Sequence, residues 1–161
     1  MKKLCLFLMS LMMFGCTGIT QYRHQISEND GTIHLYRVEE LNAAGMNAIF
    51  YVDDQSILKL GTSHYAEVPI SPGKHTISVK ADSTTQKMTY ELIVEPNQQY
   101  YFMVKANPDR LGPQMLIPFI EIVSIPGFLL IKRDKATYLQ ESTHFQPETI
   151  VLTNLDSLAV Q

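Results

Sequence analysis

The stretch Lys74–Lys80, KHTISVK, decides the fold class of this chain. Apolar side chains recur there at every second position, and they do so again in Met88–Val94, MTYELIV. A period of two is typical of a strand with one buried face and one face in water. The alternation therefore directs Ile77 to a core and Ser78 to solvent, and the polar residues 82–86 between the two runs predict a hairpin.

Five further short runs are rich in β-branched and aromatic residues, and turn formers separate them. These runs are Thr32–Val38, Met46–Asp53, Ser56–Leu60, Tyr65–Ile70 and Gln99–Lys105. Seven strands at short, regular spacing are typical of an all-β sandwich or barrel. We expect an antiparallel β-sandwich.

The apolar segment Met115–Ile131 has two interpretations. A transmembrane helix is one, but two prolines and Glu121 lie inside the segment, and both features are costly in a membrane-spanning helix. The preferred interpretation is a pair of buried strands, Leu116–Ser124 and Phe128–Lys132, which raises the expected number of strands to between seven and nine.

The chain after the last of these strands predicts a short helix within Asp134–Phe145. Asp134 is a suitable N-cap, and Tyr138, Ser142 and Phe145 share one face. Residues 146–161 form a mostly polar tail.

The first sixteen residues have the pattern of a secretory signal: Lys2 and Lys3, the apolar run Leu4–Phe14, then Gly15 and Cys16. The apolar run is too short for a hydrocarbon core of about 30 Å, which needs roughly 20 helical residues. A cleaved soluble signal is one alternative. The residues before Cys16 resemble the bacterial lipobox, and this resemblance implies that the Cys16 thiol carries acyl chains of the palmitate kind that hold the protein on a membrane. By the same resemblance, a threonine in place of aspartate after Cys16 favours the outer membrane, facing the periplasm.

Four segments are expected from these patterns. They are a signal peptide at 1–15, the lipidated Cys16 with a tether at 16–31, a β-sandwich domain at 32–132, and a short helix with a polar tail at 133–161.

Charge and cysteine content exclude two classes of site. The chain has a formal charge of −3, and without Lys2 and Lys3 it carries 11 basic and 16 acidic side chains, so nucleic acid is not an expected partner. Cys5 would leave with the signal and Cys16 would carry lipid. No cysteine pair then remains for a disulfide or a cysteine-ligated metal.

Several short motifs together resemble a family of small bacterial lipoproteins known only as a domain of unknown function. The motifs are Tyr36–Arg37, Tyr51–Asp53, Leu60, Tyr65, Pro72–His75 and Tyr100–Tyr101. They cover about residues 32–105, and the Pro-Gly-Lys-His turn also resembles surface β-modules of the PEGA type. The resemblance implies a small sandwich with no catalysis attached to the motifs. Two positions depart from the family, Asp54 and Asn97, where glycine is usual.

The same residues have architectural roles. Pro72 fixes φ and Gly73 can adopt positive φ, which predicts a structural turn before the strand that follows. Tyr100 and Tyr101 must point to opposite faces of their strand. Arg37 is expected to pair with a carboxylate such as Asp53 or to project outward.

No catalytic motif is found. His34, His64 and His75 would suit zinc if a sheet brought them together, but their spacing matches no metal motif, and separate histidines are the simpler reading. Asp53 and Asp54 are an acid–base candidate, although adjacent aspartates between strands usually form a turn. We therefore assign no catalytic residue, no metal ligand and no cofactor.

Three function classes remain open. The leading hypothesis is a non-enzymatic, lipid-anchored envelope protein that serves as a structural or protein-interaction module with an envelope protein partner. The second is a binding module for glycans or small ligands that uses exposed tyrosines such as Tyr65, Tyr90 and Tyr101. The third is a hydrolase with an unrecognised site.

Overall fold

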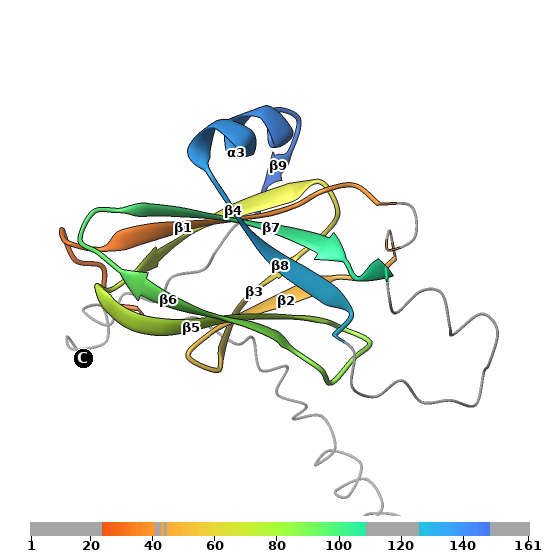
Figure 1. The fold of residues 1–161 in the computed structure, drawn as a ribbon, viewed down its shortest axis with the longest axis horizontal. Helices are drawn as coiled ribbons and strands as arrows, with labels where there is room; N and C mark the ends of the chain where they lie inside the picture. The colour runs from red at the N-terminus through yellow and green to blue at the C-terminus, as the bar shows by residue number, and fades with distance from the viewer. Residues whose placement is uncertain (1–23, 41–42, 44, 109–125, 149–161) are drawn as a thin grey trace, which may run out of the picture.

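The computed structural model describes residues 24–40, 43, 45–108 and 126–148, and these form two stacked β-sheets (Figure 1). One sheet has five strands in the order β8-β7-β1-β4-β9, and the other has four in the order β3-β2-β5-β6. The strands are β1 (Gly31–Arg37), β2 (Ala48–Val52), β3 (Gln55–Leu60), β4 (His64–Ile70), β5 (Gly73–Ala81), β6 (Met88–Val94), β7 (Gln99–Ala106), β8 (Phe128–Arg133) and β9 (Gln146–Pro147). The expected all-β sandwich is confirmed.

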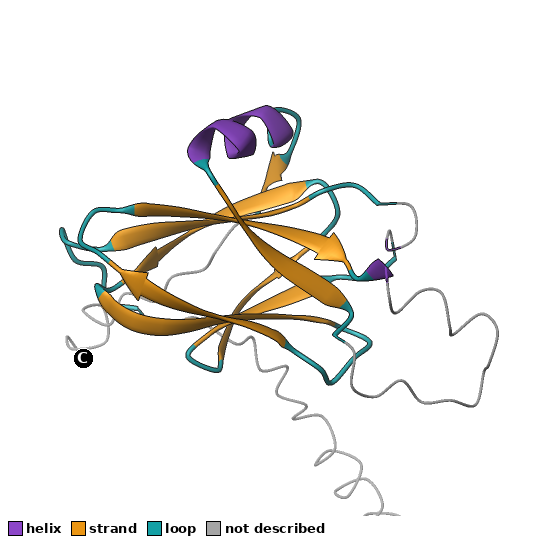
Figure 2. Cartoon of the chain, in the orientation of Figure 1, coloured by secondary structure: helices purple, strands orange, loops and turns teal. Residues whose placement is uncertain are grey.

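Most neighbouring strands run antiparallel, and two pairs are parallel (Figure 2). Strand β1 lies between antiparallel β4 and parallel β7, while β4 also pairs in parallel with the short β9. A parallel pair needs a long crossover connection, and here the whole four-stranded sheet is inserted in the chain between β1 and β7.

The core lies between the sheets and is made by alternate residues of each strand. Its fully buried members include Ile33, Leu35, Phe50, Val68, Ile77, Val79, Phe102 and Phe128. The hairpin predicted from the period-two runs is β5 paired with β6, in a register that sets Ile77 opposite Tyr90. Side-chain alternation therefore identified the inner face of this sheet.

Ser78 corrects one expectation from that alternation. It lies on the outer face of its sheet, as predicted, yet it is only 1% exposed. Its hydroxyl is 3.1 Å from that of Thr89 on β6, and Tyr51 of β2 lies opposite it in the register. Long neighbouring side chains on the outer face cover a small residue, so an outward position is not the same as an exposed one.

Arg37 corrects a second expectation, because it neither pairs with Asp53 nor projects outward. Its side chain is completely buried, donates to the carbonyls of Ala43 (2.5 Å) and Met46, and lies 4.7 Å above the ring of Phe128. Loop carbonyls without strand partners need donors, and the guanidinium supplies several. Arg37 thus holds the loop before β2 against the core.

The C-terminal part of the described chain covers the outer face of the five-stranded sheet. Helix α3 (Lys135–Glu141) follows β8 directly, and the predicted N-cap Asp134 accepts a hydrogen bond from the Thr137 amide at 2.9 Å. Strand β9 then pairs with β4, so the first residues of the expected polar tail belong to the sheet. The side chain of Tyr138 is buried against that sheet.

One further expectation matches the structure, and two lie outside the described residues. Strand β8 matches the predicted run Phe128–Lys132, whereas the predicted strand Leu116–Ser124 and the lipid-attachment residue Cys16 lie outside the described residues. Within the described ranges, no helix combines the length and the apolar character needed to cross a bilayer.

Candidate ligand-binding cleft

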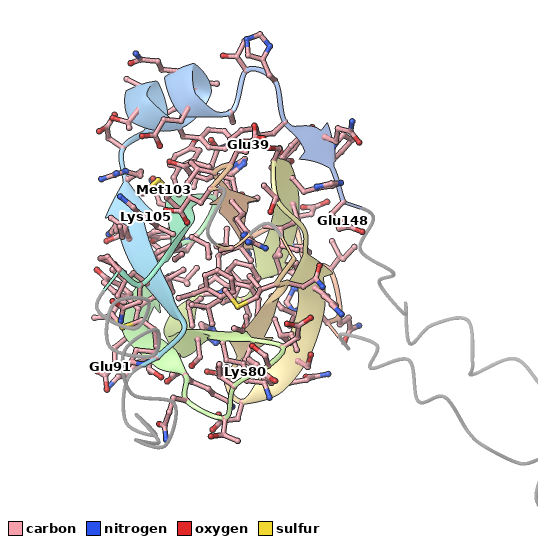
Figure 3. The ribbon with its side chains drawn as sticks, turned by 90° about the vertical axis from the view of Figure 1, so that its right-hand side faces the viewer. Glu39, Lys80, Glu91, Met103, Lys105 and Glu148 are labelled. Atoms are coloured by element: carbon pink, nitrogen blue, oxygen red, sulfur yellow. The ribbon has the colours of Figure 1, made fainter. Side chains whose placement is uncertain are left out.

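A cleft of about 370 Å³ lies between α3 and the outer face of the five-stranded sheet. Side chains of β1, β4, β7 and α3 line it, and Figure 3 shows the side chains packed in this layer, with Met103 beneath the helix. The lining residues are His34, Tyr65, Glu67, Gln99, Tyr101, Lys135, Tyr138, Leu139, Ser142, Thr143 and Phe145.

The sheet register explains why aromatic groups meet here. Strands β1 and β7 pair in parallel with His34 opposite Tyr101, and alternation sends both side chains outward while their neighbours enter the core. Tyr36 and Met103 follow two residues later on the same face. An outer sheet face is usually polar, so this apolar one needs a cover, and α3 supplies it through Tyr138.

His34 forms the floor of the cleft. It is 7% exposed and stacks on Tyr101, with ring centroids 4.6 Å apart and planes at 17°. Neither ring nitrogen has a hydrogen-bond partner among the described residues. The Glu67 carboxylate lies 3.4 Å from Nδ1, which is an electrostatic contact rather than a hydrogen bond. A buried polar group without a partner is unusual and costly, and a bound ligand is one way to satisfy it.

Burial favours the neutral form of His34. Burial lowers the pKa of His34 below its ordinary value of 6.5, because the surroundings disfavour the imidazolium. The carboxylate of Glu67 acts in the opposite direction and Lys135 adds to the lowering. A neutral imidazole offers one donor and one acceptor to a ligand.

A partly buried hydrogen bond fastens α3 over the sheet. The Tyr36 hydroxyl donates to Glu141 at 2.5 Å, and Arg133 Nε lies 3.8 Å from the same carboxylate oxygen. Burial and this acceptor raise the pKa of Tyr36, so the phenol stays protonated. The tyrosine therefore fixes the helix that forms one wall of the cleft.

The three tyrosines predicted as a ligand site are divided between two places. Tyr65 and Tyr101 both line the cleft, but Tyr101 is 6% exposed and is covered by α3. Tyr90 belongs to the other sheet and points inward, with its ring 5.2 Å from that of Phe102 in an edge-to-face contact. Tyr90 therefore packs in the core, and the pairing of β5 with β6 places it there.

Sequence reasoning named His34 only as a possible zinc ligand and Tyr138 only as part of a helix face, and it assigned neither to the ligand site. The signal was present in β1, where outward positions hold histidine and tyrosine instead of ordinary polar residues. Such a pattern indicates a covered outer face, but the sequence does not show which segment covers it.

The other candidate residues serve turns and ion pairs. His75 Nδ1 lies 2.7 Å from Asp53, which also accepts from the Thr76 amide at 2.8 Å. Burial acts to raise the pKa of Asp53, but these two hydrogen bonds outweigh it and lower the pKa. Asp54 forms an ion pair with Lys87 at 2.9 Å. The carboxylates proposed for acid–base chemistry thus have structural partners.

The turns follow the expected backbone chemistry. Asp53 and Asp54 both have positive φ in the two-residue loop between β2 and β3, and Asn97 has a φ of 59°. Gly73 opens β5 with a φ of 138°, the kind of conformation that the turn assignment for Pro72 and Gly73 requires.

The three histidines considered for zinc lie in different surroundings. His34 is in the cleft, His75 is paired with Asp53, and His64 Nδ1 is 2.7 Å from the carbonyl of Thr62. In the part of the chain that the structure describes, no group of three or more histidine, cysteine or acidic residues is placed to hold a metal ion.

No family model matches the chain, and no curated protein matches it either.

Proposed function

We propose that this chain is a non-enzymatic, lipid-anchored binding module of the bacterial cell envelope, and that the cleft beneath α3 takes a small ring-shaped ligand. The observation that carries the proposal is His34, a side chain buried to more than nine-tenths whose ring nitrogens have no hydrogen-bond partner among the described residues. Aromatic walls favour a flat or ring-shaped ligand, and a neutral imidazole supplies directional polar contacts.

The polar side chains of the cleft favour binding over catalysis. Ser142, a hydroxyl on its wall, donates to the Tyr138 carbonyl at 2.7 Å and is therefore engaged with the backbone. A hydrolase would need its nucleophile within hydrogen-bond reach of a base. Membrane attachment through Cys16 is supported by the lipobox-like pattern, and the tether before Gly31 would hold the cleft just off the membrane surface.

A fragment screen tests the proposal. We expect planar aromatic and sugar fragments to shift the NMR signals of His34 and Tyr101 in the full-length chain in detergent micelles. Leu139→Arg should abolish these shifts, because Leu139 lines the cleft and is 56% exposed, so the arginine can fill the cleft without entering the core. Ile93→Arg is the matched control, since Ile93 is 72% exposed on β6 of the other sheet.

The outcome separates the proposal from its rivals. Fragment-induced shifts that persist in Leu139→Arg would refute the assignment of the cleft as a binding site. A library in which no fragment shifts the signals of His34 or Tyr101 would refute it as well.

A protein partner is the second candidate function, and Ile93 favours it. Strand β6 is an edge of the four-stranded sheet, and this large apolar side chain is mostly exposed on it. Edge strands can pair with another chain. In-cell crosslinking should then capture an envelope protein with the native chain but not with Ile93→Arg, whereas Leu139→Arg should leave the crosslink intact.

A further inference from the structure

A second hollow adjoins the aromatic cleft. It measures about 510 Å³ and is lined by Asn97, Gln98, Gln99, Tyr101, Arg133, Asp134 and Lys135. Gln99, Tyr101 and Lys135 line both hollows, so the two meet at these three side chains. A ligand larger than a single ring can therefore reach from the aromatic cleft into a polar one.

The second hollow has a surplus of positive charge. Arg133 and Lys135 lie on its wall, and Asp134 is the acidic residue that lines it. Both carboxylate oxygens of Asp134 accept hydrogen bonds from Thr137, one from the amide at 2.9 Å and one from the hydroxyl at 2.8 Å. The aspartate is thereby committed to capping α3, which leaves the two cations facing the hollow.

Arg133 interacts with Tyr36 and Glu141 but makes no bidentate ion pair among the described residues. Its nearest carboxylate contact is Nε to Glu141 at 3.8 Å, and that oxygen already accepts the Tyr36 hydroxyl at 2.5 Å. The Arg133 Nε is buried and has no hydrogen-bond partner among the described residues, and Nη2 contacts the Met103 sulfur at 3.7 Å. A guanidinium in this condition gains more from an anionic ligand than one already paired in a bidentate fork.

Three consecutive amides complete the wall, at Asn97, Gln98 and Gln99. Gln99 Oε1 accepts the Tyr101 hydroxyl at 2.6 Å, which leaves the amide NH₂ as a donor beside the ring. Side-chain amides offer both donors and acceptors, and this matches the hydroxyl groups of a sugar, which also donate and accept.

We propose that the ligand is a saccharide that carries a carboxylate, with one ring in the aromatic cleft and its carboxylate at Arg133 and Lys135. This inference rests on the proposed binding function and names the ligand class. Arg133 shares its charge with Glu141, whereas Lys135 has no ion pair among the described residues, so Lys135 is the cation that a single carboxylate of the ligand balances. A phosphate ester carries about −1.5 to −2 charges at pH 7 and exceeds that single charge.

A matched pair of sugars tests the inference in the full-length chain in detergent micelles, with affinities taken from NMR titrations. Methyl β-glucuronide and methyl β-glucoside differ only at the carboxylate. We expect the glucuronide to bind about fivefold more tightly at low salt, the size that a partly exposed charge pair contributes. Arg133→Gln and, separately, Lys135→Gln should weaken glucuronide binding more than glucoside binding, so that the preference for the glucuronide falls.

Lys132→Gln is the matched control. It removes one positive charge from the residue next to Arg133, and the Lys132 ammonium lies 5.6 Å from the Tyr100 ring and is not part of the hollow. The preference for the glucuronide should persist in this variant. Loss of the preference in Lys132→Gln as well would show a long-range charge effect and overturn the placement of the carboxylate.

The remaining outcomes separate the ligand class from the binding function. Equal affinity for the two sugars, with shifts at Tyr101, overturns the carboxylate and leaves the cleft as a binding site. Tighter binding of glucose 6-phosphate than of the glucuronide likewise overturns the assignment of a carboxylate to the ligand. If no sugar binds while an aromatic fragment still shifts His34, the saccharide assignment is wrong and the proposed function stands. If neither sugars nor fragments bind, both proposals are wrong.

Discussion

Replacing Ile77 with alanine is the most direct test of the sandwich. Ile77 is fully buried on β5, between the two sheets and opposite Tyr90. The change removes three carbon groups at about 0.8 kcal/mol each, or about 2.4 kcal/mol of transfer free energy. Because the surrounding strands relax only partly, a cavity term raises the expected loss to about 3 to 4 kcal/mol, within the usual range of about 2 to 5.

Ser78→Ala is the control on the adjacent residue of the same strand. Ser78 is 1% exposed, but it lies on the outer face and contributes one hydroxyl contact with Thr89 at 3.1 Å. Loss of one such hydrogen bond costs about 0.5 to 1.5 kcal/mol. The two substitutions should therefore differ by about 1.5 kcal/mol or more, although both sites are buried.

Urea unfolding of the chain without residues 1–16 measures both variants. With a slope of about 2 kcal/mol per molar, Ile77→Ala should lower the unfolding midpoint by about 1.5 to 2 M and Ser78→Ala by less than about 0.8 M. Equal losses, or a larger loss at Ser78, would refute the assigned inner face. Because a register error of one residue exchanges the two faces of the strand, that result would also refute the strand pairing.

Three further predictions follow from single sites. Cys16→Ser should abolish metabolic labelling with a fatty acid and release the protein from the membrane fraction, and a variant that resists a carbonate wash would contradict lipid anchoring. Gly73→Val should lower the free energy of unfolding by about 1 to 3 kcal/mol in the same denaturation assay, since φ of Gly73 is 138°. Gly45→Val is the control and should cost less, because Gly45 has no positive φ and no atom lies within 4 Å of the added Cβ position. Because burial lowers the pKa of His34 below 6.5, the unfolded chain binds more protons than the folded chain below that pH. The free energy of unfolding should therefore decrease as the pH is lowered through 6.5, and it should decrease less in His34→Phe.

The strands were predictable because their signal is local. Each run of alternating residues specifies its own buried face, and the observed bounds of β5 and β6 match the predicted runs within one residue at each end. The turn chemistry is equally local, as Gly73 and Asn97 show with positive φ at positions that sequence alone marked.

Burial on an outer face was not predictable from the same signal. Ser78 is covered by side chains of β2 and β6, and Arg37 finds its acceptors in the loop before β2. Both outcomes depend on which strands become neighbours. The order β3-β2-β5-β6 is set by the packing of the whole molecule. A periodic pattern within one strand carries no information about which strands become its neighbours.

The cleft shows this limit most clearly, because its walls come from four elements that are distant in the sequence. Outward aromatic residues of β1 and β7 stabilise the fold only when α3 covers them. After α3, the chain continues to β9, which pairs with β4 at the edge of the sheet. A ligand in the cleft would touch both the sheet and the helix, so its binding free energy adds to that of helix docking. Anything that binds the docked form and not the undocked form must shift the equilibrium toward docking. Under the proposed binding function, the contact between Tyr36 and Glu141 that fastens α3 would therefore also contribute to the affinity for the ligand, even though Tyr36 does not line the cleft.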